Sequence, residues 1–325
     1  MSVEIRKKVP LAPYTTFKIG GPAEFFAEIK DKNDLLDSFK WAKENSQNIF
    51  ILGGGSNLLI SDRGISGLVL FFKKNDYKIL DKTSEKKIGD KVKVSADAGV
   101  MLSGLALKLA ENELSGLEWS VGIPRATVGG SVRGNAGAFG VTMGDLVYEV
   151  EVFDLNKEEF KTFHFQDCQF AYRESVFKKD KKYLIWSVVL KMEKKNKVEI
   201  KKKIEKSIQH RKNGYPKFPS AGSVFKNTAQ IETVRKYNPE VAREAEESGA
   251  VNENRIIPSG FLIERFGLKG KKIGGAKVSE QHANFIINTG NATAENVIIL
   301  MSLIKQKIRD NYGVQLEEEI ELVGF

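Results

Sequence analysis

The chain has 325 residues, of which 41% are hydrophobic and 29% charged, and its formal net charge is +9 at pH 7. This composition is typical of a soluble globular protein of two or three domains; no apolar run approaches the roughly 20 residues that span a bilayer, and residues 1–8 lack the apolar core of a secretory signal. The single cysteine, Cys168, excludes an internal disulfide and a multi-cysteine metal site, and the three histidines are widely separated, so we expect a cytoplasmic protein without membrane insertion or a metal centre.

A helix is predicted over residues 33–45, where Leu35, Leu36, Phe39 and Ala42 fall on one face. Three short apolar runs that follow have the composition of strands. They cover residues 49–52, 69–72 and 92–94.

Leucines at helical spacing predict a second helix from residue 102 to 109, which we expect Gly116 to terminate. Further strands are predicted in the middle of the chain, the last of them with strict alternation of apolar residues. They cover residues 147–155, 160–165 and 183–192.

The lysine-rich stretch 194–212 has isoleucines every four residues, which predicts a helix and the connection between domains. Between Lys178 and Lys206 there are twelve lysines and four acidic residues, a local excess that nearly equals the net charge. The lysines are not interleaved with arginines and aromatic residues as a base-stacking surface would be. We interpret the stretch as a solvated helix face and expect no nucleic-acid partner.

The last third of the chain mixes helices and strands without a strict β-α-β rhythm, so we predict an α+β fold. Helices are predicted at 231–247 and 261–266, and a strand at 284–288. The last helix is predicted to begin after an N-cap at Thr293 and to stop at Gly313, before a final strand at 319–323.

Three consecutive glycines, Gly53, Gly54 and Gly55, follow the strand 49–52. Such a loop can direct backbone N–H groups at phosphate oxygens because no Cβ blocks the approach. The spacing matches neither a dinucleotide-binding fingerprint nor a P-loop nor a hydrolase nucleophile turn. A tight structural turn is the alternative interpretation.

A second glycine-dense stretch covers residues 122–144 and includes Gly129, Gly130 and Gly137. High glycine density allows the backbone to approach a ligand closely. Two glycine loops in one domain suit a long, flat, phosphate-bearing ligand such as FAD.

The run Ser220-Ala221-Gly222-Ser223 carries a hydroxyl on a glycine turn, and Lys226 and Asn227 follow it. Such a run can present one serine and one cation to a cleft. We interpret Ser220 as the turn residue and Ser223 as the functional one.

These segments resemble, in chain order, the motifs of the UDP-N-acetylenolpyruvoylglucosamine reductase family, flavoenzymes that make the muramic acid precursor of peptidoglycan. The resemblance covers almost the whole chain. It is carried by residues 14–23, 53–57, 128–138, 172–175, 223–227, 262–264 and 316–320.

The resemblance implies an FAD-binding module of the vanillyl-alcohol-oxidase (PCMH) type in residues 1–193, with lobes of about 1–72 and 73–193, and a smaller α+β substrate domain in 194–325. FAD would be held non-covalently, because neither histidine nor cysteine occurs in the glycine loops. The implied cofactor-binding residues are Gly53, Gly54, Gly55, Ser56, Asn57, Leu58, Thr127, Gly129, Gly130, Asn135, Ala136 and Gly137.

The family's reaction implies that NADPH reduces FAD, which passes a hydride to C3 of UDP-N-acetylglucosamine enolpyruvate. Arg173 would stabilise the resulting carbanion with Glu319, and Ser223 would donate the proton to C2. The sequence alone hardly distinguishes Glu319 from its neighbours Glu317 and Glu318 as the catalytic carboxylate. The implied substrate contacts are Tyr172, Lys226, Asn227 and His282.

Two features depart from the commonest family pattern. The segment Gly122-Ile123-Pro124-Arg125-Ala126-Thr127 contains one additional residue and lacks a glycine, so Arg125 or Thr127 could take over a phosphate contact. The short connection between residues 192 and 223 resembles the type II-like subfamily that lacks a substrate loop.

We therefore expect a monomeric, FAD- and NADPH-dependent reductase of a UDP-sugar. One alternative is another FAD-dependent oxidoreductase of the same fold that acts on a different sugar or alcohol. A second alternative is a non-enzymatic binder of nucleotide sugars or nucleic acid that uses the lysine-rich face.

Overall fold

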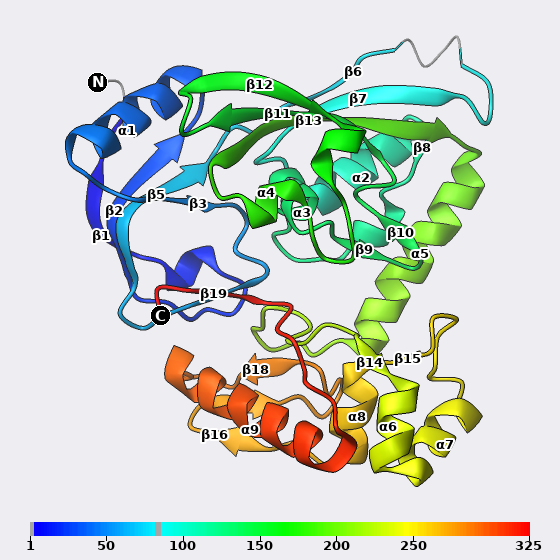
Figure 1. Ribbon diagram of the computed structural model, residues 1–325. Helices are drawn as coiled ribbons and strands as arrows, with labels where there is room; N and C mark the ends of the chain where they lie inside the picture. The colour runs from blue at the N-terminus through cyan, green and yellow to red at the C-terminus, as the bar shows by residue number, and fades with distance from the viewer. Residues whose placement is uncertain (1–2, 82–85) are drawn as a thin grey trace. The chain divides into compact units, whose positions relative to one another are not determined.

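The computed structural model describes residues 3–81 and 86–325. Met1 and Ser2, which belong to the segment examined for a secretory signal, lie outside these ranges. The chain forms two compact units, and neither is continuous in sequence (Figure 1). Unit 1 consists of Met1–Val9, Ala23–Gly55 and Ser66–Asn213, and unit 2 of Pro10–Pro22, Ser56–Ile65 and Gly214–Phe325. The domain boundary expected after residue 193 stays a prediction.

Unit 1 contains a four-stranded sheet and a six-stranded sheet. The first has the strand order β1-β2-β5-β3 and consists of β1 (Arg6–Pro10), β2 (Pro22–Ile29), β5 (Ile65–Phe72) and β3 (Ile49–Leu52). The second has the order β12-β11-β13-β7-β6, with β8 also paired to β13, and consists of β12 (Glu159–His164), β11 (Val147–Asp154), β13 (Tyr183–Lys194), β7 (Lys91–Asp97), β6 (Tyr77–Ile79) and β8 (Leu114–Ser115). A small hairpin joins β9 (Gly137–Ala138) and β10 (Val141–Thr142).

The central strand of the larger sheet is β13, and its alternation is confirmed. Leu184, Trp186, Val188, Leu190 and Met192 are all buried, because successive side chains of a strand point to opposite faces. One continuous hydrophobic core includes residues from both sheets of unit 1. Helices α3 (Val128–Arg133) and α4 (Val176–Lys179) pack on the larger sheet (Figure 1).

Helix α1 (Lys32–Glu44) begins where predicted, because the carboxylate of Asp31 accepts a hydrogen bond from the backbone of Asp34. Leu35 and Ala42 lie in the core as expected. Leu36 does not: its side chain is 43% exposed, since helical spacing carries it around to the edge of the buried face.

Helix α2 (Leu102–Glu111) also forms as predicted, but Gly116 does not terminate it. The helix ends five residues earlier, at Glu111, and its C-cap is Asn112. Gly116 instead has a φ of +141°, and an added Cβ would come within 2.9 Å of Leu146 Cδ2. A glycine is needed at position 116 because this backbone conformation and the nearby Leu146 side chain disfavour a Cβ. The residue lies between β8 and the short helix η3 (Glu118–Ser120).

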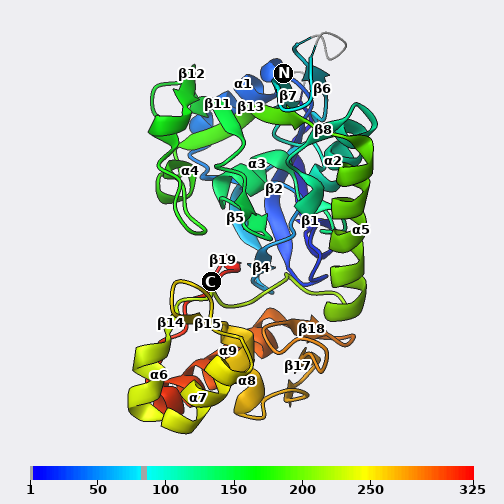
Figure 2. The same cartoon turned by 90° about the vertical axis from the view of Figure 1, so that its right-hand side faces the viewer.

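The lysine-rich stretch forms helix α5 (Lys197–Gly214), which lies along one side of unit 1 (Figure 2). Ile200 is buried, and the guanidinium of the buried Arg211 donates hydrogen bonds to the carbonyls of Val121 and Trp119. Most of its lysines are exposed, as expected of a solvated helix face.

Cys168 lies at the end of the short helix η4 (Phe165–Cys168) and is fully buried. Burial, with a smaller contribution from the charge of Asp167, raises the pKa of its thiol to about 12. Since the thiolate is the reactive form, this cysteine is a structural residue.

Unit 2 has short strands and a larger helical layer (Figures 1 and 2). Its pairs and sheets are formed by β14 (Ala229–Gln230) with β15 (Ile256–Ile257), β16 (Lys272–Ile273) with β17 (Ala276–Val278) and β18 (Ile286–Asn288), and β19 (Glu321–Val323) with β4 (Leu58–Ile60). Its helices are η1 (Ala12–Tyr14), α6 (Ile231–Tyr237), α7 (Pro239–Glu247), α8 (Ser259–Arg265) and α9 (Ala294–Tyr312).

Helix α9 is confirmed at both ends. The Thr293 hydroxyl caps its first turn in a reciprocal pair with Asn296, and Gly313 ends it with a φ of +66°. Its predicted core face, including Leu300 and Ile304, is buried.

Three predictions in unit 2 differ from the structure. The strand expected at 284–288 is shorter, because β18 covers only Ile286–Asn288. The helical region at 231–247 is divided into α6 and α7, because Asn238 adopts a non-helical conformation and Pro239 starts a new helix. The last strand begins at Glu321 rather than Glu319, since only Glu321–Val323 pair with β4.

The predicted α+β class is confirmed. None of the helices in residues 3–81 and 86–325 combines the length and apolar character needed to cross a membrane.

Candidate functional site

The first glycine segment in unit 1 follows β3, which pairs in parallel with β5. The carboxyl ends of parallel strands are common positions for nucleotide phosphates. Gly54 is buried, and an added Cβ would lie 1.4 Å from the carbonyl oxygen of Arg125. The Arg125 side chain donates from Nε to the Gly54 carbonyl at 2.9 Å. Arg125, from the part of the second glycine segment that departs from the family pattern, therefore holds the first glycine segment in place.

The second glycine segment is not the loop that its composition predicts, because residues 128–133 form helix α3. Thr127 is the N-cap, and its hydroxyl accepts from the backbone of Gly130. The N–H groups of Val128 and Gly129 donate to the carbonyls of residues 100 and 98. The first turn of α3 is thus satisfied by protein, and Gly129 is a glycine because a Cβ would lie 2.7 Å from the Cβ of Ala98.

The two glycine segments lie against each other inside unit 1. An added Cβ on Gly53 would come within 2.9 Å of the Thr127 hydroxyl. This adjacency agrees with one ligand that touches both segments, although most of the glycines are already required by protein packing.

Asn135 follows α3 with a φ of +41° and is buried. Its amide donates to the Ala171 carbonyl at 2.8 Å and accepts from the Gly144 backbone at 2.9 Å. Ala136 donates its N–H to Ser131, and Gly137 begins the β9–β10 hairpin. The side chain of Asn135 therefore holds the segment that leads to Arg173.

Arg173 lies in a tight turn closed by a bridge between Ala171 and Glu174, and it has a φ of +57°. Its guanidinium donates to the Gly137 carbonyl at 3.2 Å and lies 5.3 Å from the centroid of the Tyr172 ring. The structure thus brings the predicted catalytic arginine and Tyr172 together with the predicted cofactor residue Gly137.

Ser56, Asn57 and Leu58 follow the glycines, but they belong to unit 2. Leu58 starts β4 and is paired with Glu321 of β19. The Asn57 amide donates to the carbonyl of Glu319 at 3.0 Å. Asn57 is therefore connected to the segment of the predicted catalytic glutamate.

Ser223 follows Gly222, whose φ of +83° confirms the predicted glycine turn. The two residues after it, Val224 and Phe225, are buried and anchor the run in the core of unit 2. Ser223 forms an isolated bridge with Phe285, and the Glu319 N–H donates to the Val224 carbonyl at 2.8 Å. The predicted proton donor and the predicted catalytic carboxylate thus lie on hydrogen-bonded segments.

Asn284 is a residue that the sequence analysis missed, and it holds the Ser223 run in place. Its side chain is buried, donates to the Phe225 carbonyl at 2.8 Å and accepts from the Phe225 N–H at 3.0 Å. Its own carbonyl accepts from Val224. An amide between two apolar residues of a predicted strand was the available signal, because a buried amide must find partners.

The structure separates the three consecutive glutamates. Glu317 pairs with Lys226 at 3.4 Å, and Glu318 pairs with Lys305 of α9 at 2.6 Å. Glu318 also forms an isolated bridge with Phe225. Glu317 and Glu318 are thus each paired with a lysine, and the family resemblance is what selects Glu319 as the catalytic candidate.

The other predicted substrate contacts lie in the same unit. The side-chain oxygen of Asn227, Oδ1, accepts a hydrogen bond from the backbone N–H of Ser259, the first residue of α8. His282 accepts at Nδ1 from the Asn284 N–H, and its ring lies 4.8 Å from that of Phe285. Both residues therefore also have structural contacts around the Ser223 run.

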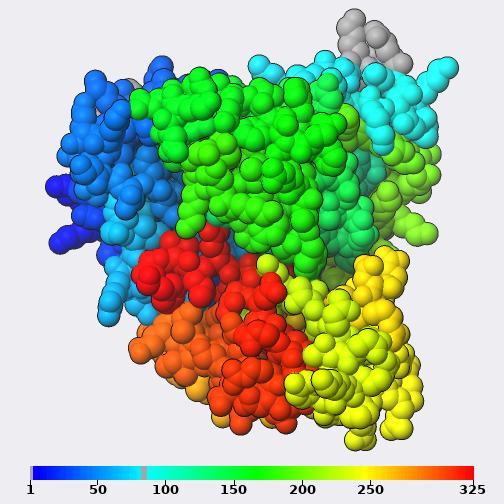
Figure 3. Space-filling view, viewed as in Figure 1, coloured from blue at the N-terminus to red at the C-terminus, as the bar shows by residue number. Residues whose placement is uncertain are grey.

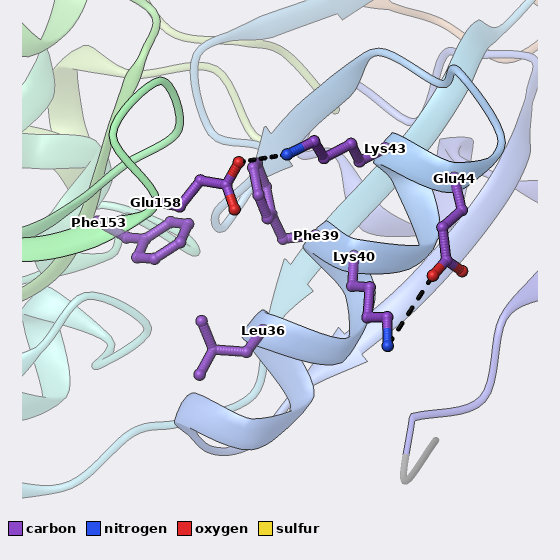
Figure 4. Close-up of a pocket in the computed structure, with 7 residues that line it drawn as sticks. All are labelled: Leu36, Phe39, Lys40, Lys43, Glu44, Phe153 and Glu158. Carbon is purple, nitrogen blue, oxygen red and sulfur yellow. Dashed lines mark hydrogen bonds and ion pairs between the residues drawn. The ribbon is translucent and has the colours of Figure 1, made fainter.

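Two surface pockets lie apart from Arg173, Ser223 and Glu319. The larger, of about 430 Å³, lies between α1 and the β11–β12 hairpin and is crossed by the Lys43–Glu158 ion pair (Figure 4). A second, of about 330 Å³, lies on α9 and includes Lys305 and Glu318. Neither is lined by a predicted catalytic residue.

Comparison with known proteins gives two matches within the chain. Residues 23–162 match the family described as FAD binding domain, and residues 214–323 match the UDP-N-acetylenolpyruvoylglucosamine reductase, C-terminal domain. Together with the paired glycine segments, the first match defines the chain as an FAD-binding protein.

Individual relatives match nearly the full length of the chain. A UDP-N-acetylenolpyruvoylglucosamine reductase from Caldanaerobacter subterraneus is 37% identical over 97% of this chain and 92% of its own. One from Solibacter usitatus is 34% identical over 99% of this chain and 98% of its own. The crystal structure of the Thermus caldophilus enzyme covers 100% of both chains with 30% identity and a TM-score of 0.74. The chain belongs to the UDP-N-acetylenolpyruvoylglucosamine reductase family.

Proposed function

We propose that this protein reduces UDP-N-acetylglucosamine enolpyruvate to UDP-N-acetylmuramate in peptidoglycan precursor synthesis, as a monomer in the cytoplasm. The observation that carries the proposal is the backbone hydrogen bond from Glu319 to Val224, which joins the segments of the two catalytic candidates Glu319 and Ser223. The full-length likeness to reductases with this name supports the substrate class.

FAD fits the chemistry of unit 1, because a loop without Cβ atoms follows a parallel strand and is held by Arg125. Gly53, Gly54 and Gly55 would hold its pyrophosphate, and Thr127, Gly137 and their neighbours would line the remainder. When bound, FAD supplies to C3 of the enolpyruvyl group a hydride that it has taken from NADPH. The glycine loops contain no histidine or cysteine, so the attachment is non-covalent.

Hydride addition at C3 places negative charge on C2 and on the adjoining carboxylate. Arg173 is suited to stabilise this charge because its guanidinium stays ionised and can form two hydrogen bonds to a carboxylate. Glu319 is assigned to the same charge as a hydrogen-bond donor, a role that requires its neutral acid form. Ser223 donates a proton to C2, which completes the saturated lactyl ether.

Lys226, Asn227, Tyr172 and His282 are assigned to the substrate. A cation such as Lys226 suits the diphosphate, and its weak 3.4 Å contact with Glu317 is open to exchange for a phosphate oxygen. Asn227 is exposed, so its amide is accessible to a sugar or phosphate while it holds α8.

The substitution Ser223→Ala tests the assignment of the proton donor. Flavin reduction by NADPH should stay near the wild-type rate, whereas reoxidation by the enolpyruvyl nucleotide should slow by about 10²–10⁴-fold, the usual value of general acid catalysis. Rapid-mixing absorbance measurements under anaerobic conditions follow the two half-reactions separately.

Ser220→Ala is the matched control, since it removes a neighbouring hydroxyl of the same glycine turn. It should leave both half-reactions near the wild-type rate. If Ser223→Ala slowed both half-reactions equally, Ser223 would be a structural residue, and the proposed mechanism would be wrong.

A further inference from the structure

We propose that Lys305 is a positioning residue for Glu319 and that it acts through Glu318. The inference rests on the proposed role of Glu319 in catalysis. Lys305 lies on α9, and its Nζ is 2.6 Å from Glu318 Oε1. Glu318 is the immediate neighbour of Glu319, so the pair constrains the backbone that carries the catalytic carboxylate.

The segment between α9 and β19 needs such a constraint because residues 313–320 form no regular helix or strand. It follows α9 at the surface of unit 2 (Figure 3). Leu316 and Ile320 are buried at either side of the glutamates. Between them, the backbone is held by hydrogen bonds from Lys226 to Glu317 and from Glu319 to Val224, both 2.8 Å long.

In an extended segment, neighbouring side chains point to opposite faces. Glu317 and Glu319 therefore share one face, on which Glu317 meets Lys226, a predicted substrate contact. Glu318 points to the other face, toward α9 and Lys305. The ion pair with Lys305 thus fixes which of the three carboxylates faces away from the substrate.

The pair is partly withdrawn from water, with side-chain exposures of 27% for Lys305 and 33% for Glu318. Apolar atoms of Met301 and Leu322 line the same pocket. Removal of the cation would leave a partly buried carboxylate without its partner, which favours movement of Glu318 toward solvent. Because a displacement of about 1 Å can reduce a rate by up to about 10²-fold, we expect Lys305→Met to slow the step that uses Glu319 by about tenfold.

Lys269→Met provides a matched control in the same unit. Lys269 Nζ is also 2.6 Å from a glutamate, Glu264, and its side chain has the same 27% exposure. Neither residue contacts the 317–319 segment through a hydrogen bond or ion pair among those described in residues 86–325. Glu264 is more exposed than Glu318, at 54% against 33%, so Lys269→Met should lower the thermal midpoint no more than Lys305→Met does.

The test measures both half-reactions of the full-length flavoprotein by anaerobic rapid mixing. With Lys305→Met, reoxidation by UDP-N-acetylglucosamine enolpyruvate should slow by about tenfold, while reduction by NADPH should not change. Lys305→Arg should restore most of the lost rate, because it keeps the charge. In Glu318→Met the same step should slow, and adding Lys305→Met to it should cause little further loss, because the two residues act as one unit.

The inference would be overturned if Lys305→Met reoxidised like Lys269→Met, or if it slowed both half-reactions to the same extent. A failure of the proposed function looks different. In that case the wild-type flavin would itself not be reoxidised by the enolpyruvyl nucleotide.

Discussion

Several residues of the two glycine segments, which are proposed to bind FAD, are also needed for packing within the protein. Gly54 allows the two segments to approach, and the N–H groups at the start of α3 are used by protein carbonyls rather than left for phosphate. Asn135, which the family resemblance assigns to the cofactor, uses its amide to hold the turn before Arg173. Residues of this kind can affect FAD binding without touching it.

Gly54→Ala should destabilise unit 1 and lower its flavin content. Its methyl group would lie 1.4 Å from the Arg125 carbonyl oxygen, so one of the two segments must move. We expect a loss of about 1–3 kcal/mol in the free energy of unfolding, as for other overpacked sites. Urea unfolding and the ratio of flavin to protein absorbance measure the two effects.

Gly104→Ala is the control for that substitution. Gly104 lies in α2, where no atom is within 4 Å of an added Cβ. Alanine should therefore stabilise the protein by roughly 0.5–1 kcal/mol and leave flavin content unchanged. Equal stability of the two variants would refute the packing role of Gly54.

At the scale of elements, the periodic spacing of apolar residues predicted those helices and strands that depend on neighbouring residues alone. The alternation of β13 and the capped face of α9 appear as expected, because neighbouring residues determine both. The break at Asn238 and the late start of β19 were missed. The first depends on one residue's backbone conformation, and the second on pairing with β4, which is distant in sequence.

Strand β13 ends in a charge cluster that gives a pH-dependent contribution to stability. Ion-paired hydrogen bonds from Lys195 and Lys91, at 2.6 Å and 2.9 Å, lower the pKa of Glu193 from 4.5 to about 2. Because the folded pKa is depressed, the stabilisation is complete above about pH 4.5, the unfolded value, and is lost as the pH falls toward 2.

Glu193→Gln should remove this contribution. The variant should be less stable than the wild type at pH 6, and the difference should shrink as the pH falls from about 4.5 to 2. Thermal unfolding across that range measures the difference. A constant difference at every pH would show that the charge of Glu193 is not responsible.

At the scale of the whole molecule, the order of the motifs predicted the family and the fold class, but the units are not continuous stretches. Residues 56–65 belong with the C-terminal part because β4 pairs with β19, and residues 10–22 contact it through the Asn288 amide, which donates to the Phe17 carbonyl. Local patterns encode neither contact. The same limit applies to the candidate site. The sequence proposes Ser223 and Glu319 as candidates, but it does not predict the hydrogen bond between their segments or the Asn284 contact.

The central claim is that this chain uses FAD to reduce an enolpyruvyl nucleotide. Its most direct test is an anaerobic titration of the purified protein, followed by flavin absorbance. The proposal predicts a yellow protein that NADPH bleaches and that regains its colour when UDP-N-acetylglucosamine enolpyruvate is added. A protein that cannot be loaded with FAD, or a bleached flavin that this nucleotide does not reoxidise, would contradict it.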